Sequence, residues 1–354
     1  MDKPTIHPIS SGNMHTVNLY FVASPLQYLA ARAIAEHSTL EERQILVWYK
    51  PGVGSVIAKQ DWDTVFYMPW PRFYPLPGRF GRLRRLIENI EMVSGLIGKC
   101  DTLNIHSAVF DTEAINYFLR ALPQSSGAKH TRARILPDGI ISIRRYPLNC
   151  IKRVLQYLKK LRYLVDRRLN YWCFSGDRIG SDAPFCDRIY VIAGLPHEYP
   201  PDKTVALPPL VKQCDDQSKA DDKRALVIGQ PLVGSGLLSQ DDLKVVTQDI
   251  WLWLQNAGFK HVDYKQHPKD PNLELCCEDY SLLDLAEPLE TWMAKKHYGA
   301  VLGVRSSALL FARQVYATDV PVLAFGWNKI RFKSESEALD MKKAFISCNV
   351  YIYN

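Results

Sequence analysis

The sequence predicts an α/β protein made of two Rossmann-like domains that face each other across a cleft. Three observations support this fold class. Strand and helix patterns alternate through the first half of the chain, a linker rich in proline and charge covers residues 198–223, and a second alternation starts at Arg224. With 354 residues, of which 47% are hydrophobic, the chain is long enough for two cores of ordinary size.

Short apolar runs between helical patterns define the first domain, residues 1–210. The predicted strands cover residues 17–23, 44–48, 64–68, 102–105 and 134–136, and the predicted helices cover residues 26–34, 82–97 and 111–122. Ser24 and Pro25 precede the first helix as a capping residue and a first-turn proline. This order favours a largely parallel sheet that helices cover on both faces.

The second domain, residues 211–330, repeats the alternation. Its predicted strands cover residues 224–229, 260–265, 299–304 and 320–325, and its predicted helices cover residues 241–255 and 308–314. A last helix, residues 334–345, lies in the segment 331–354. We expect that segment to pack back on the first domain.

Composition indicates the kind of partner and the compartment to expect. The formal charge of +7 and the pI of about 8.9 favour an anionic partner, although no pattern indicates nucleic acid. Eight scattered cysteines without a Cys-x-x-Cys pair are typical of reduced thiols. No signal peptide is apparent, and no run approaches the ~18 apolar residues of a spanning helix. We expect a cytoplasmic protein, with peripheral contact to the inner membrane left open.

One segment departs from the alternation. Residues 143–168 carry nine basic residues against one acid, Asp166, and apolar residues recur at helical spacing from Ile151 to Val165. Such a basic amphipathic helix, residues 149–168, can lie on an anionic membrane or bind an anionic polymer. The alternative is an ordinary surface helix whose apolar stripe faces the core.

Polar residues after two strands of the second domain form a candidate phosphate site. His267 and Pro268 follow one strand, and Ser306 and Ser307 follow another and open a helix. Ligands of open α/β sheets lie beyond strand carboxyl ends, and anions favour helix N-termini. The alternatives are a packed histidine and a simple helix cap. The glycine pattern that binds a pyrophosphate is absent, so the site suits a phosphate but not ATP or NAD.

A candidate general base lies in the first domain. Asp138 and Gly139 follow a predicted strand, where a carboxylate could take a proton from a hydroxyl. The alternative is a turn aspartate, since Pro-Asp-Gly is a common turn sequence. The loop Gly229-Gln230-Pro231 follows the first strand of the second domain and could touch a ligand at the domain interface. No spacing typical of metal ligands is present, so we expect no metal.

Together these motifs resemble bacterial sialyltransferases of the two-domain GT-B type, in particular the capsule polysialyltransferases and the lipopolysaccharide sialyltransferases. That family has an Asp-Gly motif, a His-Pro motif and a Ser-Ser or Ser-Thr pair in this order, matched here by Asp138-Gly139, His267-Pro268 and Ser306-Ser307. Residues 23–27 and 228–231 are similar to two of its turns. One departure is Pro137, where the polysialyltransferase pattern usually has an acid.

The resemblance implies an inverting, metal-independent and cofactor-independent transfer of sialic acid from CMP-Neu5Ac to a hydroxyl of a bacterial surface glycan, in lipopolysaccharide, O-antigen or capsule. Asp138 would be the base and His267 would assist the leaving phosphate. The implied acceptor side contains Ser24, Pro25, Gln27 and Gly139, and the implied donor side contains Gly229, Gln230, Pro231, His267, Pro268, Ser306 and Ser307. The alternatives are transfer of another CMP-activated acidic sugar, such as legionaminic acid or Kdo, and a non-enzymatic nucleotide- or sugar-binding protein with two lobes.

Overall fold

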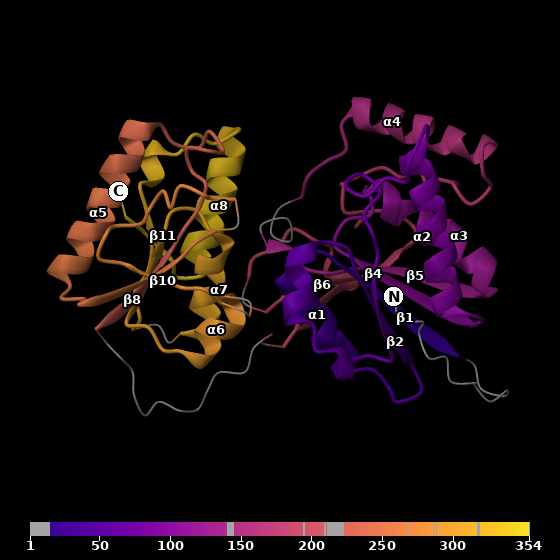
Figure 1. The fold of residues 1–354 in the computed structure, drawn as a ribbon, viewed down its shortest axis with the longest axis horizontal. Coiled ribbons are helices and arrows are strands. Elements are labelled where there is room, and N and C mark those ends of the chain that lie inside the picture. Colours follow the sequence, from indigo (N-terminus) through magenta and orange to yellow (C-terminus); the bar gives the residue numbers. More distant parts are fainter. Residues whose placement is uncertain are drawn as a thin grey trace.

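The computed structural model describes residues 15–139, 145–193, 195–208, 210, 223–267, 269–285, 287, 289–316 and 319–353. Two lobes lie side by side, and each contains its own sheet (Figure 1). All strand pairs within the two sheets are parallel. The predicted pair of Rossmann-like domains is confirmed.

The first sheet has seven strands in the order β3-β2-β1-β4-β5-β6-β7. Its strands are β1 (Thr16–Val22), β2 (Arg43–Trp48), β3 (Thr64–Tyr67), β4 (Thr102–Ser107), β5 (His130–Ile135), β6 (Cys186–Ile192) and β7 (Thr204–Leu207). Its helices are α1 (Pro25–Glu36), α2 (Gly81–Ile97), α3 (Glu113–Ser126) and α4 (Cys150–Lys160). Because the first half of this order is that of a Rossmann fold, ligands are expected beyond the carboxyl ends of the central strands.

The second sheet has six strands in the order β10-β9-β8-β11-β12-β13. Its strands are β8 (Arg224–Ile228), β9 (His261–Lys265), β10 (Ser281–Leu282), β11 (Ala300–Gly303), β12 (Val322–Phe325) and β13 (Tyr351–Tyr353). Its helices are α5 (Gln240–Asn256), α6 (Leu289–Lys295), α7 (Ser307–Val315) and α8 (Glu335–Ser347).

Burial on both faces explains why the central strands are continuous apolar runs. In β1, Leu19 and Phe21 pack into one core with α2 and α3, whereas Tyr20 and Val22 pack into another with α1. Successive side chains of a strand point to opposite faces, so a strand covered on both faces is mostly apolar. The buried Asn18 of β1 is an exception, and its Oδ1 accepts a hydrogen bond from Asn104 Nδ2 at 2.8 Å. The second lobe has one core, which joins side chains from both sides of its sheet.

The predictions for the linker between the lobes and for the C-terminal helix were wrong. The segment 198–223 was expected to be a linker, yet β7 lies within it and pairs with β6 along Thr204–Leu207. Only one of its four residues is buried, which is why no apolar pattern marked it. The change from the first sheet to the second therefore falls between residues 207 and 224.

The C-terminal helix does not pack on the first domain. The buried side chains Met341, Ala344 and Phe345 of α8 belong to the core of the second lobe, and the chain continues into β13, which pairs with β12. The sequence could not decide this, because an apolar stripe identifies a buried face without identifying the surface that covers it.

Gly229 lies where β8 passes closest to its neighbour. A Cβ atom at Gly229 would lie 2.4 Å from the hydroxyl oxygen of Tyr264 and 3.0 Å from the carbonyl oxygen of Lys265. Tyr264 is fully buried and its hydroxyl donates a hydrogen bond to Asp270 Oδ2 at 3.2 Å. Neither neighbour can move freely, so only glycine fits at the start of this loop.

We therefore expect Gly229→Ala to destabilise the second lobe by about 1–3 kcal/mol, the usual cost of overpacking. Thermal and urea unfolding of the variant would measure this. Gly95→Ala is the matched control, since Gly95 lies in α2 with nothing within 4 Å of an added Cβ. That control should gain about 0.5–1 kcal/mol from its better helix propensity. Equal melting temperatures for Gly229→Ala and wild type would contradict the prediction.

Candidate functional site

The first half of the candidate site follows strands β1, β2 and β5 at the carboxyl edge of the first sheet. Ser24 Oγ donates a hydrogen bond to Asp138 Oδ1 at 3.4 Å and accepts one from the backbone N–H of Gln27 at 3.3 Å. Gln27 Oε1 in turn accepts from Ala23 N–H at 2.7 Å. The start of α1 therefore positions the Asp138 carboxylate, and Ser24 and Asp138 lie together at this edge of the sheet.

The surroundings of Asp138 suit a base. Burial raises the pKa of its carboxyl above the usual 3.8, while hydrogen bonds from Gln27 and Ser24 and the positive charge of Lys50 partly offset that rise. A general base is most effective when its pKa approaches the working pH. Asp138 is therefore shifted in the direction that catalysis requires.

Sequence reasoning missed an aromatic pair beside Asp138. Tyr49 stacks on Trp70 with ring centroids 4.4 Å apart. Burial raises the pKa of the Tyr49 hydroxyl, and the nearby negative charge of Asp138 adds to the rise. Tyr49 and Lys50 directly follow β2, so their position after a predicted strand was the signal that could have revealed them.

In the second lobe, His267 follows β9 and is held by its own loop. The backbone N–H of Lys269 donates to His267 Nδ1 at 3.0 Å, which leaves the ring proton on Nε2. Burial lowers the pKa of His267, and the positive charge of Lys269 lowers it further. The ring is therefore neutral at pH 7 and offers one N–H donor. Pro268 lies outside the described residues.

The two serines before α7 have different environments. Ser306 is the N-cap, and its Oγ accepts a hydrogen bond from Ala308 N–H at 3.2 Å. Ser307 is the first residue of the helix and contacts the other lobe. A Cβ atom placed on Gly139 would lie 3.4 Å from Ser307 Oγ and 3.6 Å from Ser307 Cβ. The turn that contains Asp138 therefore lies against the N-terminus of α7.

One further contact crosses this junction, and a second supports the serine turn from within the second lobe. Gln314 of α7 donates from Nε2 to the carbonyl oxygen of Ala193 in the first lobe at 2.9 Å. Gln230 Oε1 accepts from Arg305 N–H at 2.8 Å, which ties the loop after β8 to the serine turn. This bond places Gln230 next to the serine turn.

The predicted grouping of His267 with the serine pair around one phosphate is not tested by any contact between these residues. In the described part of the chain, no hydrogen bond joins His267 to Ser306 or Ser307. The glycines after Pro231 are also less open than expected, because Val233 N–H and Gly234 N–H donate to the Glu274 carboxylate at 2.7 and 3.0 Å. A phosphate cradle that includes both His267 and the serine pair stays a prediction.

Comparison with a known protein family covers one half of the candidate site and not the other. The chain matches the alpha-2,8-polysialyltransferase family over residues 197–323. This segment contains Gly229, Gln230, Pro231, His267, Ser306 and Ser307, whereas Asp138 lies outside it. The resemblance predicted from the motifs is confirmed there. The chain has no match among curated protein sequences.

Solved structures show the fold. The spinosyn rhamnosyltransferase SpnG, in complex with thymidine diphosphate, superposes with a TM-score of 0.51 at 12% identity, over 96% of this chain and 86% of that one. The calicheamicin glycosyltransferase CalG4 gives 0.48 at 12% identity, covering 97% and 86%. MurG of Acinetobacter baumannii gives 0.47 at 7% identity, again covering 97% and 86%. The fold is of the GT-B type, and together with the family match it supports a glycosyltransferase.

Alanine substitutions of the two serines should have different effects. Ser306→Ala removes a helix cap and should lower the free energy of unfolding by about 1 kcal/mol. Ser307→Ala should leave stability near wild type and weaken CMP binding by about 10- to 150-fold, the value of one hydrogen bond to a charged group. Calorimetric titration with CMP and thermal melting would check both. A larger loss of CMP affinity in Ser306→Ala than in Ser307→Ala would contradict this assignment.

Proposed function

We propose that this protein is an inverting, metal-independent sialyltransferase that transfers sialic acid from CMP-Neu5Ac to a hydroxyl of a bacterial surface glycan. The observation that carries the proposal is the contact of Gly139 with Ser307. The turn that carries the partly buried Asp138 carboxylate of one lobe lies beside a helix N-terminus of the other. A base and an anion site at one junction are what a transfer from a nucleotide sugar requires.

The donor side would stabilise one phosphate. A CMP leaving group develops charge on a single phosphate, which a neutral histidine N–H, a serine hydroxyl and the positive end of a helix dipole can stabilise together. His267, Ser307 and the first turn of α7 would supply those groups. The family match supports this half, because its residues 197–323 include all of them.

On the acceptor side, Asp138 would remove the proton from the attacking hydroxyl. The hydroxyl would attack the sialyl carbon on the face opposite the phosphate, so that the new bond has the inverted configuration. The raised pKa of Asp138 supports the role of base. The stacked pair Tyr49 and Trp70 would offer an apolar wall against which an acceptor sugar can lie.

The acceptor and its linkage remain open between galactosides and sialosides. The family match does not cover the half of the chain that contains Asp138, and Pro137 stands where polysialyltransferases usually have an acid. We therefore propose a lipopolysaccharide or capsule glycan as the acceptor class, without assigning polymerisation. A cytoplasmic location, where CMP-sugars are made, is part of the proposal.

The direct test uses purified protein, CMP-Neu5Ac, and a panel of labelled galactosides and oligosialosides in buffer with EDTA, with products read by mass spectrometry. We expect sialyl transfer to the acceptor without metal, with release of CMP. NMR of the product should show an anomeric configuration opposite to that of the donor.

Activity that appears only when Mg²⁺ or Mn²⁺ is restored would reject metal independence. Transfer from CMP-Kdo or a CMP-legionaminic donor instead would replace sialic acid, and CMP binding without turnover would favour the binding-protein alternative.

Asp138→Asn should reduce transfer at least ~100-fold, the usual scale for a lost general base, and leave the Kd for CMP unchanged. Since the base must be deprotonated, kcat/KM of the wild type should fall on acidification with an apparent pKa above 3.8. This acid limb should vanish from the residual activity of the variant. Asp241→Asn is the control, because that side chain is 94% exposed on α5. Near-normal transfer by Asp138→Asn would remove Asp138 as the base.

A further inference from the structure

The helix α4 and the 3-10 turn that follows it, Leu161–Leu164, expose an apolar surface to solvent. α4 runs along the outer rim of the first lobe (Figure 1). Ile151 is 71% exposed, Leu164 83% and Val165 71%. The remaining large exposed side chains of this segment are Val154, Leu155, Tyr157, Leu158, Leu161 and Tyr163. We call this surface the α4 face.

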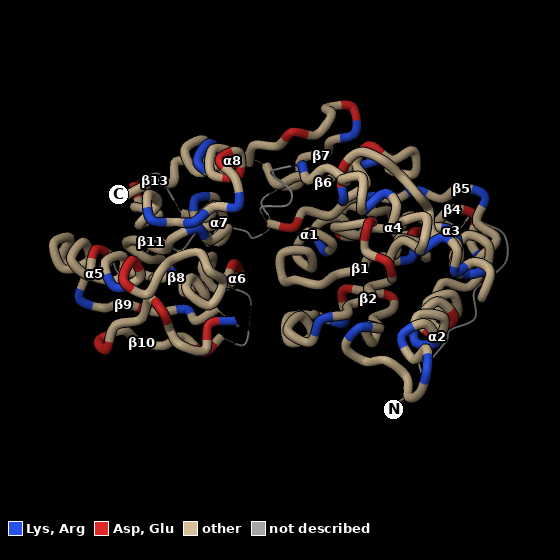
Figure 2. Tube along the Cα trace, turned by 90° about the horizontal axis from the view of Figure 1, so that it is seen from above, with Lys and Arg blue, Asp and Glu red and all other residues tan. Residues whose placement is uncertain are grey.

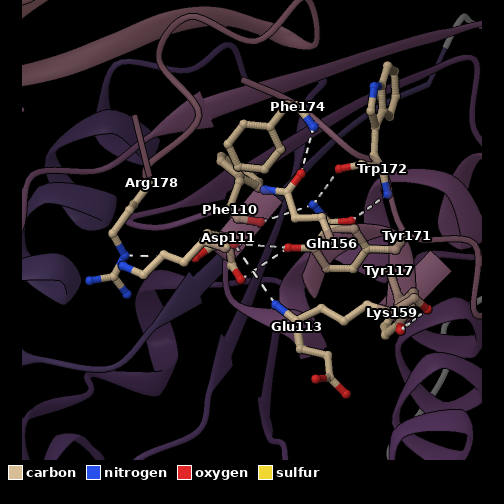
Figure 3. A network of polar contacts seen from close by, with 12 residues as sticks. Phe110, Asp111, Glu113, Tyr117, Gln156, Lys159, Tyr171, Trp172, Phe174 and Arg178 are labelled. Carbon is tan, nitrogen blue, oxygen red and sulfur yellow. Dashed lines mark hydrogen bonds and ion pairs between the residues drawn. The ribbon is translucent and has the colours of Figure 1, made fainter. Parts of the chain in front are cut away.

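The polar side of α4, not its apolar side, faces the protein. Gln156 is the buried residue of the helix, and its Oε1 accepts from Phe174 N–H at 2.9 Å. The carbonyl oxygen of Lys159 accepts from the Tyr117 hydroxyl at 2.9 Å. Lys159 Nζ lies 3.9 Å from Asp111 Oδ1 and 4.9 Å from the centre of the Tyr171 ring (Figure 3).

This orientation is the reverse of the one found in an ordinary surface helix. A soluble amphipathic helix turns its apolar stripe to the core and its charges to water. Here the polar anchors fix the helix with the stripe outward, so the core-facing alternative considered from the sequence is wrong. A contiguous apolar surface of this kind on a globular protein marks a binding surface.

Charge indicates what binds there. Basic and acidic residues are interspersed over both lobes (Figure 2), so positive charge alone does not distinguish α4. Within the segment, Lys159, Arg162 and Arg168 pair with acids. Lys152, Arg153, Lys160 and Arg167 have no ion pair with any described acid. Arg153, Lys160 and Arg167 are exposed and accompany the exposed apolar stripe, whereas Lys152 lies on the same side of the helix as the buried Gln156. Exposed cations beside an exposed apolar stripe are the combination that binds anionic lipid surfaces.

We propose that the α4 face docks the protein on the surface of an anionic lipid bilayer. The apolar side chains would enter the interface between headgroups and acyl chains, and Arg153, Lys160 and Arg167 would lie among anionic headgroups. In the described part of the chain, no helix could span a membrane, so this would be peripheral attachment. The inference does not depend on the transferase activity.

The position of α4 gives the attachment a consequence. Asp111, which contacts α4, lies in the loop after β4, and Asp138 follows the adjacent strand β5. Parallel neighbours end at the same edge of the sheet, so the loop that anchors α4 and the candidate base follow strand ends at one edge. A bilayer docked there would bring a lipid-linked glycan to the acceptor side.

Vesicle flotation with the full chain tests the proposal, using pure phosphatidylcholine and a mixture with phosphatidylglycerol. We expect binding to the mixture only, and weaker binding as salt rises. Two double variants probe the face and two probe matched sites on the second lobe. The apolar variant is Ile151→Ser with Leu158→Ser, and its control on α5 is Val245→Ser with Leu252→Ser. The charge variant is Arg153→Gln with Lys160→Gln, and its control on α8 is Lys342→Gln with Lys343→Gln.

The apolar variant should lose about tenfold in lipid affinity for each side chain, and the charge variant about fivefold for each cation. Controls should bind as wild type, and melting curves should show that all four variants are folded. Failure of wild type to bind phosphatidylglycerol vesicles, or equal losses in the controls, would overturn the proposal. Sedimentation of wild type as a dimer that the apolar variant dissociates would assign the face to a second copy instead. CMP binding should be unchanged in every variant, which separates this test from that of the proposed function.

Discussion

The close approach of Gly139 to Ser307 is the contact on which the candidate site depends. Gly139 adopts a left-handed backbone, with φ of 51°, and its turn lies so near the N-terminus of α7 that a Cβ atom on Gly139 would be in van der Waals contact with Ser307. Each lobe alone holds half of a site: a carboxylate with raised pKa on one side, and a capped helix N-terminus on the other. The two halves meet because the turn at Gly139 packs against the turn at Ser307.

Rigid elements support both halves. Ser24 caps α1 and also donates to Asp138, so the same hydroxyl fixes a helix and a carboxylate. In the second lobe, Ser306 caps α7 while Gln230 holds Arg305, and Gln314 ties the helix to the first lobe. Positioning by caps and strand ends restricts movement of the reactive groups more than positioning by open loops would.

The helix α4 shows how a few buried polar bonds can determine the use of a surface. The buried Gln156 side chain and the Lys159 carbonyl are held by the protein, and breaking such bonds would leave polar groups unpaired in the interior. These bonds therefore keep the apolar stripe of α4 facing outward. A membrane is the environment in which that stripe would no longer be exposed to water.

The sequence by itself determined the strands, the helices and the order of the motifs, because burial on both faces leaves continuous apolar runs and because caps and turns are local. It also determined that Asp138, Gln230, His267 and Ser307 lie at strand ends. Only the tertiary structure decided which of them meet, since Gly139 and Ser307 are far apart in sequence and contact across two lobes. It also decided which side of α4 faces outward and where α8 packs. Periodicity shows which residues share a face, but the covering surface comes from elsewhere in the chain.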